Sequence, residues 1–330
     1  MAPRYFPILL ACSLSAVIST TTAVWAADPP ASFPNKEIRF VVPWNAGGSN
    51  DIAARALAQL ASEQGVRVIV ENVPGATGSI GMTKVANAEP DGYVIGMGTS
   101  STLALIAQNL TPLRNEQFAP IARVTIDPLV LLVPSNGPAT TLESFIGHLK
   151  KNPGKVSIGT PGSNNLNHIF AVMTGRAAGV EVIAVPYTGG SKVIADLAGK
   201  QIDAAVLKPS ESKALIDGGL VKPIAVFANE RLKALPDVPT FKEKGFDIFP
   251  HGLLVQMAYI VAPAAIPTVI RERLIAIFSK AIQSAKFKSS AEDSGAVVDD
   301  LTGVNLGREI TNVQKSLNEV GKKVFVAEKK

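Results

Sequence analysis

Residues 38–51 read IRFVVPWNAGGSND, and this stretch decides how the fold begins. Its first residues form a short β-rich run, which predicts a strand that ends at Pro43. Residues 52–63 follow with apolar side chains on one helical face and predict a helix. The paired glycines Gly47 and Gly48 let the backbone approach a ligand closely, and the N–H groups at a helix N-terminus favour an anion. The stretch therefore predicts a strand, a glycine turn suited to an anion, and a helix.

The same alternation of strand and helix continues along the chain. Short β-rich runs are separated by helical segments of about ten residues, which predicts βαβ units and parallel pairing. The predicted strands are 38–42, 66–71, 94–97, 130–133, 156–159, 182–185, 204–207, 224–227 and 259–262. The predicted helices are 52–63, 79–88, 142–150, 166–176, 193–198, a short helix after strand 204–207, 267–285 and 306–324.

This order falls into two strand–helix series followed by C-terminal helices. We expect an α/β fold of two lobes with a cleft between them, mixed but mainly parallel sheets, and two crossover connections. The crossings are placed near residues 125–129 and 251–257, and the C-terminal helices should pack back on the first lobe. We assign residues 27–127 and 255–330 to lobe I, and residues 128–254 to lobe II.

The N-terminus has the three parts of a secretory signal peptide. Arg4 supplies the positive charge, residues 5–18 are apolar, and residues 24–26 end in a small-residue cleavage site. We therefore expect residues 1–26 to be removed on export. Cys12 is the only cysteine, so the mature chain would have no thiol, which suits an oxidising compartment. The residues around Cys12 also loosely resemble a lipoprotein signal, and lipid attachment there is the alternative.

The composition excludes several classes of function. The 330 residues are 47% hydrophobic and 18% charged with a net charge of +5, which describes a well-cored globular protein without a nucleic-acid footprint. No later apolar stretch is long enough to span a membrane. The three histidines, His148, His168 and His251, are too separated for an obvious zinc site, and no Gly-x-Ser-x-Gly elbow occurs. We expect a binding protein without metal, cofactor or catalysis.

Donor-rich loops follow three of the predicted strands. They are residues 43–51, 159–165 and 186–191, each between a strand and a helix. Ligands of open α/β sheets bind beyond the carboxyl ends of strands. Each loop could instead be a plain capped turn, with Ser49, Asn50 or Asp51 capping the first helix. Together the three loops predict a site for negatively charged oxygens.

The residues that carry these loops resemble a known family. Residues 43–51 are similar to the V-P-[FW]-x-A-G-G-x-x-D signature of the Bug family, the periplasmic receptors of tripartite tricarboxylate transporters. Further matching segments follow in the family's order over essentially the whole mature chain. These segments are 71–76, 89–93, 186–190, 199–203 and 234–240.

The resemblance implies a two-lobed "Venus flytrap" that binds a small carboxylate in the periplasm and passes it to the membrane subunits of a transporter. It also implies a monomer, with the ligand held by residues of both lobes. The implied ligand-binding residues of lobe I are Trp44, Ala46, Gly48, Ser49 and Asp51, with Ser100, Ser101 and Thr102 able to line the same lobe. Those of lobe II are Thr160, Ser163, Asn164, Tyr187 and Thr188. We add Asn165 and Lys208 as candidate ligand contacts, although both depart from the family pattern.

The chain departs from the family pattern beside the expected cleft. Asn165 stands where the family often has His, and Lys208 stands where an Asp is common. A Trp-x-Gly expected before Ala262 is also missing. We hypothesise that the Lys208 ammonium pairs with a ligand carboxylate; the alternative is a lysine that points to solvent or pairs with Glu211. His168, just past the second loop, could also touch the ligand.

Two other functions remain open at this stage. A sensor subunit would bind the same ligand but dock on a signalling receptor, and a periplasmic enzyme would turn the ligand over. The ligand itself could be an aliphatic dicarboxylate, a hydroxy-tricarboxylate or an aromatic dicarboxylate. The sparse aromatic residues offer little surface on which an aromatic ligand could stack.

Overall fold

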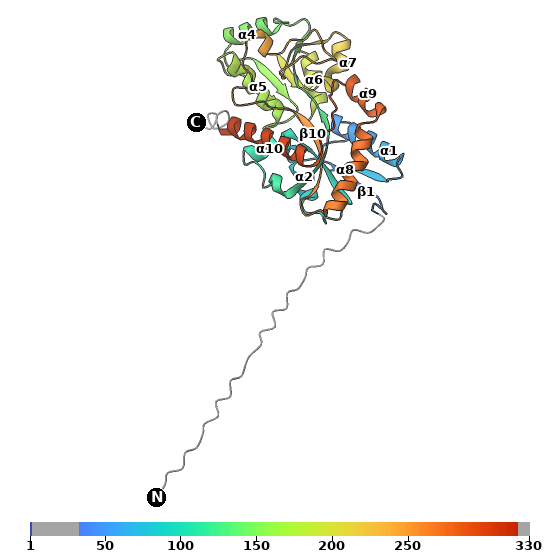
Figure 1. Ribbon diagram of the computed structural model, residues 1–330. Coiled ribbons are helices and arrows are strands. Elements are labelled where there is room, and N and C mark those ends of the chain that lie inside the picture. The colour runs from blue at the N-terminus through green and yellow to red at the C-terminus, as the bar shows by residue number, and fades with distance from the viewer. Residues whose placement is uncertain (2–32, 323–330) are drawn as a thin grey trace.

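The computed structural model describes Met1 and residues 33–322, which form two five-stranded sheets with helices beside them (Figure 1). The strand order is β2-β1-β3-β10-β4 in the first sheet and β7-β6-β8-β5-β9 in the second. We call each sheet with its helices lobe I and lobe II, and the predicted two-lobed α/β fold is confirmed. The proposed signal peptide with Cys12 lies outside the described residues.

Both sheets mix parallel and antiparallel pairs. In lobe I, β1 is parallel to β2 and β3, and β10 is antiparallel to β3 and β4. In lobe II, β6 is parallel to β7 and β8, and β5 is antiparallel to β8 and β9. The strands are β1 (Ile38–Val42), β2 (Val68–Asn72), β3 (Val94–Thr99), β4 (Phe118–Ile126), β5 (Val130–Pro134), β6 (Ser157–Thr160), β7 (Ile183–Pro186), β8 (Ala204–Leu207), β9 (Val221–Val226) and β10 (Met257–Pro263). Parallel pairs do not outnumber antiparallel ones, because each strand that enters a lobe by a crossing runs against both of its neighbours.

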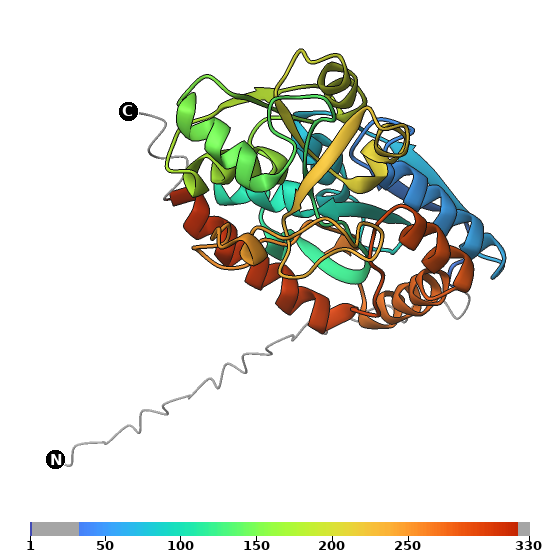
Figure 2. The same cartoon turned by 90° about the horizontal axis from the view of Figure 1, so that it is seen from above.

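Two layers of helices cover the sheet of lobe I. Phe40 of β1 packs with α1 (Ser49–Ser62), α8 (Thr268–Ile282) and α9 (Ala285–Asp293) on one face. Its neighbour Val41 packs on the other face with α2 (Ser79–Ala86), α3 (Ser100–Ala107) and α10 (Gly303–Val320). The alternation follows from the period of two in a strand. The C-terminal helices α8 and α10 contact β4 and so return to lobe I, and Figure 2 shows α10 along one side of the molecule.

Four helices belong to lobe II: α4 (Leu142–Lys151), α5 (Leu166–Ala177), α6 (Gly190–Ala198) and α7 (Pro209–Asp217). Phe145 and Phe170, from α4 and α5, share one hydrophobic cluster with Leu103 of α3. Helices α3 and α5 are in contact, so the two lobes meet through an apolar interface.

The crossings between the lobes run side by side. Residues 127–129 connect β4 to β5, and the chain returns to β10 after residue 250. The Asp127 N–H donates to the Gln256 carbonyl at 2.8 Å, which ties the two crossings together. The Ser100 hydroxyl donates to the Val255 carbonyl at 2.5 Å and fastens the second crossing to α3. Both crossings lie where they were predicted, and the exact boundaries at 127/128 and 254/255 remain our proposal.

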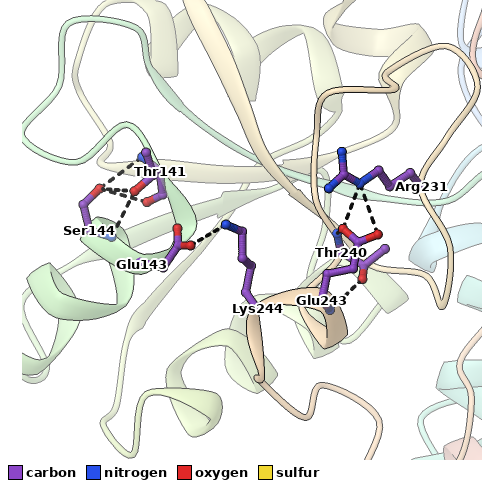
Figure 3. A network of polar contacts seen from close by, with 7 residues as sticks. All are labelled: Thr141, Glu143, Ser144, Arg231, Thr240, Glu243 and Lys244. Atoms are coloured by element: carbon purple, nitrogen blue, oxygen red, sulfur yellow. Dashed lines mark hydrogen bonds and ion pairs between the residues drawn. The ribbon is translucent and has the colours of Figure 1, made fainter.

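The long segment between β9 and β10 is fastened to lobe II by side chains (Figure 3). The Lys244 ammonium pairs with Glu143 of α4 at 2.5 Å, while the Arg231 guanidinium donates to Glu243 at 2.8 Å within the segment itself. Helix α4 itself is capped by Thr141, whose hydroxyl accepts the Ser144 N–H at 3.2 Å.

Three elements were not predicted from the sequence. Strand β4 contains Pro120 and Arg123, which interrupt its apolar pattern. Helix α3 has the sequence SSTLALIA and is buried from Ser100 to Leu105, so it lacks the polar face that marks a surface helix. Helix α9 is short and follows directly on α8, where a single helix ending at residue 285 was expected.

The glycine turn is held in shape by Asp51. Its buried carboxylate accepts the Gly47 N–H at 2.9 Å, the Asn72 amide at 2.9 Å and the Arg55 guanidinium at 3.0 Å. The Asn72 amide also donates to the Trp44 carbonyl at 3.1 Å, so both ends of the turn are fixed from β2. Burial alone would raise the pKa of Asp51, but the bonds from Arg55, Gly47 and Asn72 outweigh it and lower the pKa below 3.8.

Replacing Asp51 by alanine should lower the free energy of unfolding by about 2 kcal/mol at neutral pH, since three donors lose their acceptor. The pKa of this carboxyl is lowered by folding, so its stabilisation is present above the ordinary value of 3.8 and is lost as the pH falls through the folded-state value. Urea unfolding of the wild type and the variant should therefore show a difference that shrinks on acidification.

Asp217→Ala is the matched control, because Asp217 forms an exposed pair with Lys213 at the same i,i+4 spacing in α7. We expect no measurable loss of stability from it. Equal losses in the two variants, or a difference that grows at low pH, would contradict the role given to Asp51.

Candidate ligand-binding site

The helix that follows β1 begins without a side-chain cap. Gly48 is the N-cap of α1, and the first helical bond runs from the Ile52 N–H to the Gly48 carbonyl at 3.0 Å. The N–H groups of Ser49, Asn50 and Asp51 therefore have no partner within the helix. The expectation that one of these three side chains caps the helix is wrong, because the Asp51 carboxylate is turned back to Gly47. An uncapped N-terminus with exposed glycines is a ready site for an anion.

The helices that follow β2 and β3 also begin without a side-chain cap, although the Ser79 N–H at the start of α2 donates to the Ala76 carbonyl. Gly78 precedes α2 and Thr99 precedes α3, and neither N-cap makes a side-chain hydrogen bond. Since β2, β1 and β3 are neighbours in the sheet, the three helix N-termini lie along one edge of lobe I. We call this row the open edge: the N-termini of α1, α2 and α3. Their partial positive charges add at one place.

Two hydroxyls beside the open edge are buried without a hydrogen-bond partner. They are Thr99 Oγ1 and Thr102 Oγ1. A Cβ placed on Gly78 would lie 3.4 Å from Thr102 Oγ1 and 3.0 Å from Cζ2 of Trp44, so Trp44 and Thr102 come together around Gly78. A buried hydroxyl without a partner is costly, and such groups in native proteins call for a specific explanation. Thr99 and Gly78 were missed by sequence reasoning, although each directly precedes a helix after a strand.

Ser100 has a structural task. Its hydroxyl donates to Val255 and accepts the Met257 N–H at 3.2 Å, so it anchors the second crossing. Ser101 is buried beside it in α3, and Ala46 and Gly48 are exposed in the glycine turn.

The second loop satisfies most of its own donors. Asn165 caps α5, since its side-chain oxygen accepts the His168 N–H at 2.9 Å. The Asn164 N–H donates to Nδ1 of His168 at 2.9 Å, and Thr160 donates to the Gly162 carbonyl at 2.8 Å. Burial lowers the pKa of His168, which keeps the ring neutral and able to accept. Ser163 is exposed at the tip of the loop.

The third loop is filled by a carboxylate of the protein itself. A Cβ on Gly190, the first residue of α6, would lie 3.1 and 3.2 Å from the two oxygens of Glu211. Burial raises the pKa of Glu211, with Lys208 opposing the shift and Asp127 adding to it. The Tyr187 hydroxyl donates to Asp196 at 3.0 Å, while Thr188 is exposed. This loop therefore has less to offer an anion than its sequence suggests.

Lys208 reaches from lobe II to the glycine turn. Its ammonium is 3.0 Å from Asp127 Oδ2 and 3.1 Å from the Ser49 hydroxyl, and the side chain is buried. Thr125 donates to the same oxygen of Asp127 at 2.9 Å. Lys208 thus neither points to solvent nor pairs its ammonium with Glu211, which accepts only the Lys208 backbone N–H, at 3.3 Å.

A second polar contact joins the lobes. The Gln108 amide, at the end of α3, donates to the Asn164 carbonyl in the second loop at 2.8 Å. Lobe I and lobe II are therefore closed on each other at two points, through Lys208 and through Gln108. The predicted site residues Ser49, Lys208 and Asn164 all take part in these contacts.

One cavity lies away from these contacts, within lobe I. It has a volume of about 240 Å³ under α3 and α10, and Thr102, Phe118, Tyr259 and Ile310 are among its lining residues. Within residues 33–322 no cluster of His, Cys, Asp or Glu could hold a metal ion, and no helix is long and apolar enough to cross a membrane.

Comparison with known proteins gives a consistent picture. The family model described as "Tripartite tricarboxylate transporter family receptor" matches residues 52–316. A UPF0065 protein of Bordetella pertussis is 33% identical over 265 residues, which cover 79% of this chain and 81% of that protein. BugT of the same organism is 29% identical over 244 residues, covering 72% and 75% of the two chains.

Solved structures agree in fold over nearly the whole chain. The periplasmic binding protein BugD superposes with a TM-score of 0.80 at 28% identity, covering 88% of this chain and 98% of BugD. MatC from Rhodopseudomonas palustris with bound malate gives 0.79 at 26% identity, with 88% and 100% covered. A second R. palustris protein, with adipate, gives 0.81 at 25% identity, with 88% and 98% covered. The chain therefore belongs to the family of tripartite tricarboxylate transporter receptors, which are solute-binding proteins and not enzymes.

Proposed function

We propose that this chain is a periplasmic receptor that captures a small carboxylate between its two lobes and delivers it to the membrane subunits of a tripartite tricarboxylate-type transporter. The observation that carries the proposal is the open edge, where α1, α2 and α3 begin without side-chain caps on neighbouring strands. The structural relatives with malate and adipate support a carboxylate as the ligand class. The predicted signal peptide, residues 1–26, supports export.

In this proposal one carboxylate of the ligand lies on the open edge. It accepts from the N–H groups at the start of α1 and from the hydroxyls of Ser49, Thr99 and Thr102, with the Trp44 ring beside it. Asp51 does not contact the ligand directly in this proposal, because its carboxylate has no donor and already accepts hydrogen bonds within the turn. It supports the site by fixing the glycine turn. Ala46, Gly48, Ser100 and Ser101 stay proposed as backbone or lining contacts of the same lobe.

The far end of the ligand meets lobe II. The second loop, with Thr160, Ser163, Asn164 and Asn165, and the residues Tyr187 and Thr188 remain the proposed contacts there. Many of their side-chain groups already have partners, so we expect backbone groups and ordered water to carry much of this recognition. Lys208 of lobe II contacts Ser49 of lobe I and so lies between the two parts of the proposed site.

The expected hydrogen-bond energies are sufficient for reversible binding of a carboxylate. A dissociation constant of about 1 μM requires about 8 kcal/mol of binding free energy. Charge-assisted hydrogen bonds contribute about 1.5–3 kcal/mol each, so about four to six of them cover both this energy and the cost of ordering the lobes.

The direct test is a thermal-shift screen of the mature protein against succinate, L-malate, adipate, citrate and phthalate, followed by calorimetry on the best member. We expect at least one to raise the melting temperature and to bind with one molecule per chain at micromolar affinity. A folded protein that responds to none of them would overturn the proposed ligand class. Delivery is tested separately: deletion of the gene should abolish uptake of the bound carboxylate, whereas a sensor subunit would leave uptake intact.

Thr102→Val tests the open edge itself. Valine has the shape of threonine and removes a buried hydroxyl that has no partner, so stability should be unchanged or slightly higher. Affinity for the best carboxylate should fall about tenfold if the hydroxyl donates to the ligand.

Ser279→Ala is the matched control for this variant. Ser279 in α8 also has a buried hydroxyl without a partner, but it lies on the other face of the sheet from α3. It should keep full affinity. An unchanged affinity in Thr102→Val would remove Thr102 from the site.

A further inference from the structure

We infer that Lys208 determines ligand specificity by completing the carboxylate site from the opposite lobe, so that the receptor selects carboxylates without a neighbouring amino group. The inference rests on the proposed function and concerns the same site. Lys208 is the N-cap of α7 in lobe II, while Ser49 is the first residue of α1 in lobe I. Their contact of 3.1 Å spans 159 positions of sequence and exists only when the lobes meet.

The ammonium is held in place by Asp127. Lys208 and Asp127 are each only 6% exposed, and Asp127 lies in the first crossing, where Thr125 also donates to it. A lysine has three N–H donors. The described contacts, to Asp127 and to Ser49, account for two of them, which leaves one donor for a ligand beside Ser49.

The contact also orients the Ser49 hydroxyl. Ser49 Oγ accepts from the ammonium, so its own proton is directed to a different acceptor. A carboxylate accepts hydrogen bonds and donates none. The Ser49 hydroxyl, the uncapped N–H groups of α1 and the third Lys208 donor are thus matched to one carboxylate, and hydrogen bonds in such a chain strengthen one another.

The charges around this point disfavour a cationic substituent. The start of α1 carries the positive end of the helix dipole, and Lys208 brings a full positive charge to the same residue. The carboxylates described around this point are already engaged: Asp127 Oδ2 takes two donors, the Glu211 oxygens lie near Gly190, and the Asp51 carboxylate holds the glycine turn. An ammonium on the carbon next to the ligand carboxylate would lie beside like charge, whereas a hydroxyl would not.

The experiment compares ligands that differ only in this substituent. Calorimetry on the mature wild type should show L-malate bound at least tenfold more tightly than L-aspartate, and adipate at least tenfold more tightly than L-2-aminoadipate. A wild type that binds either amino acid as tightly as its partner acid overturns the inference.

The variant Lys208→Met/Asp127→Asn removes both charges of the ion pair together, so that Asp127 is not left as an unpaired buried carboxylate. We expect it to bind the preferred acid at least tenfold more weakly and to lose most of the discrimination. Lys213→Met, on the exposed side of the same helix, should behave as the wild type. In a double-mutant cycle, Ser49→Ala should have much less effect on binding in the double variant than in the wild type.

Two failures are distinguishable. If the folded wild type binds no carboxylate of the panel, the proposed function fails and the inference falls with it. If the wild type binds a carboxylate and Lys208→Met/Asp127→Asn binds it equally well, the inference alone fails, and Lys208 is only an anchor of the crossing.

Discussion

The first turn of every α-helix leaves backbone N–H groups that the helix cannot satisfy, and the two lobes of this receptor treat them differently. In lobe II, Thr141 caps α4 and Asn165 caps α5. Helices α6 and α7 have no side-chain cap, but the Glu211 carboxylate lies against the start of α6 and accepts the N–H of Lys208, the N-cap of α7. In lobe I the helices after β1, β2 and β3 have no such side chain. We therefore place most of the contacts of the proposed carboxylate site on lobe I.

Much of the fold follows from local sequence. The β-rich run before Pro43, the paired glycines and the start of the helix after them are all visible in residues 38–51. The sequence offers Thr140 or Thr141 as the cap of α4, and the structure selects Thr141. The elements that escaped prediction are those whose burial hides the usual pattern. Helix α3 is covered on all sides, and β4 carries Pro120 and Arg123 inside a strand.

The candidate site was harder to predict because its partners are far apart in sequence. The spacing that marks Asp51 and Asn165 as loop residues does not reveal that one holds the glycine turn and the other caps a helix. Lys208 finds Asp127 across 81 positions and Ser49 across 159. No local pattern encodes such contacts, since they depend on how two sheets meet. Thr99 and Gly78 can be recognised as site residues only once β1, β2 and β3 are known to be neighbours in the sheet.

The hydrogen bond between the Gln108 amide and the Asn164 carbonyl is the second polar contact between the lobes. Unlike the contact at Lys208, it involves no charged group. It joins a side chain of one lobe to the backbone of the other, so the side chain at position 164 is not required for it. A pair of fluorophores placed at or beside these two positions would have its separation set by the angle between the lobes. If the proposed ligand changes that angle, these two positions are attachment points for an optical sensor of its binding.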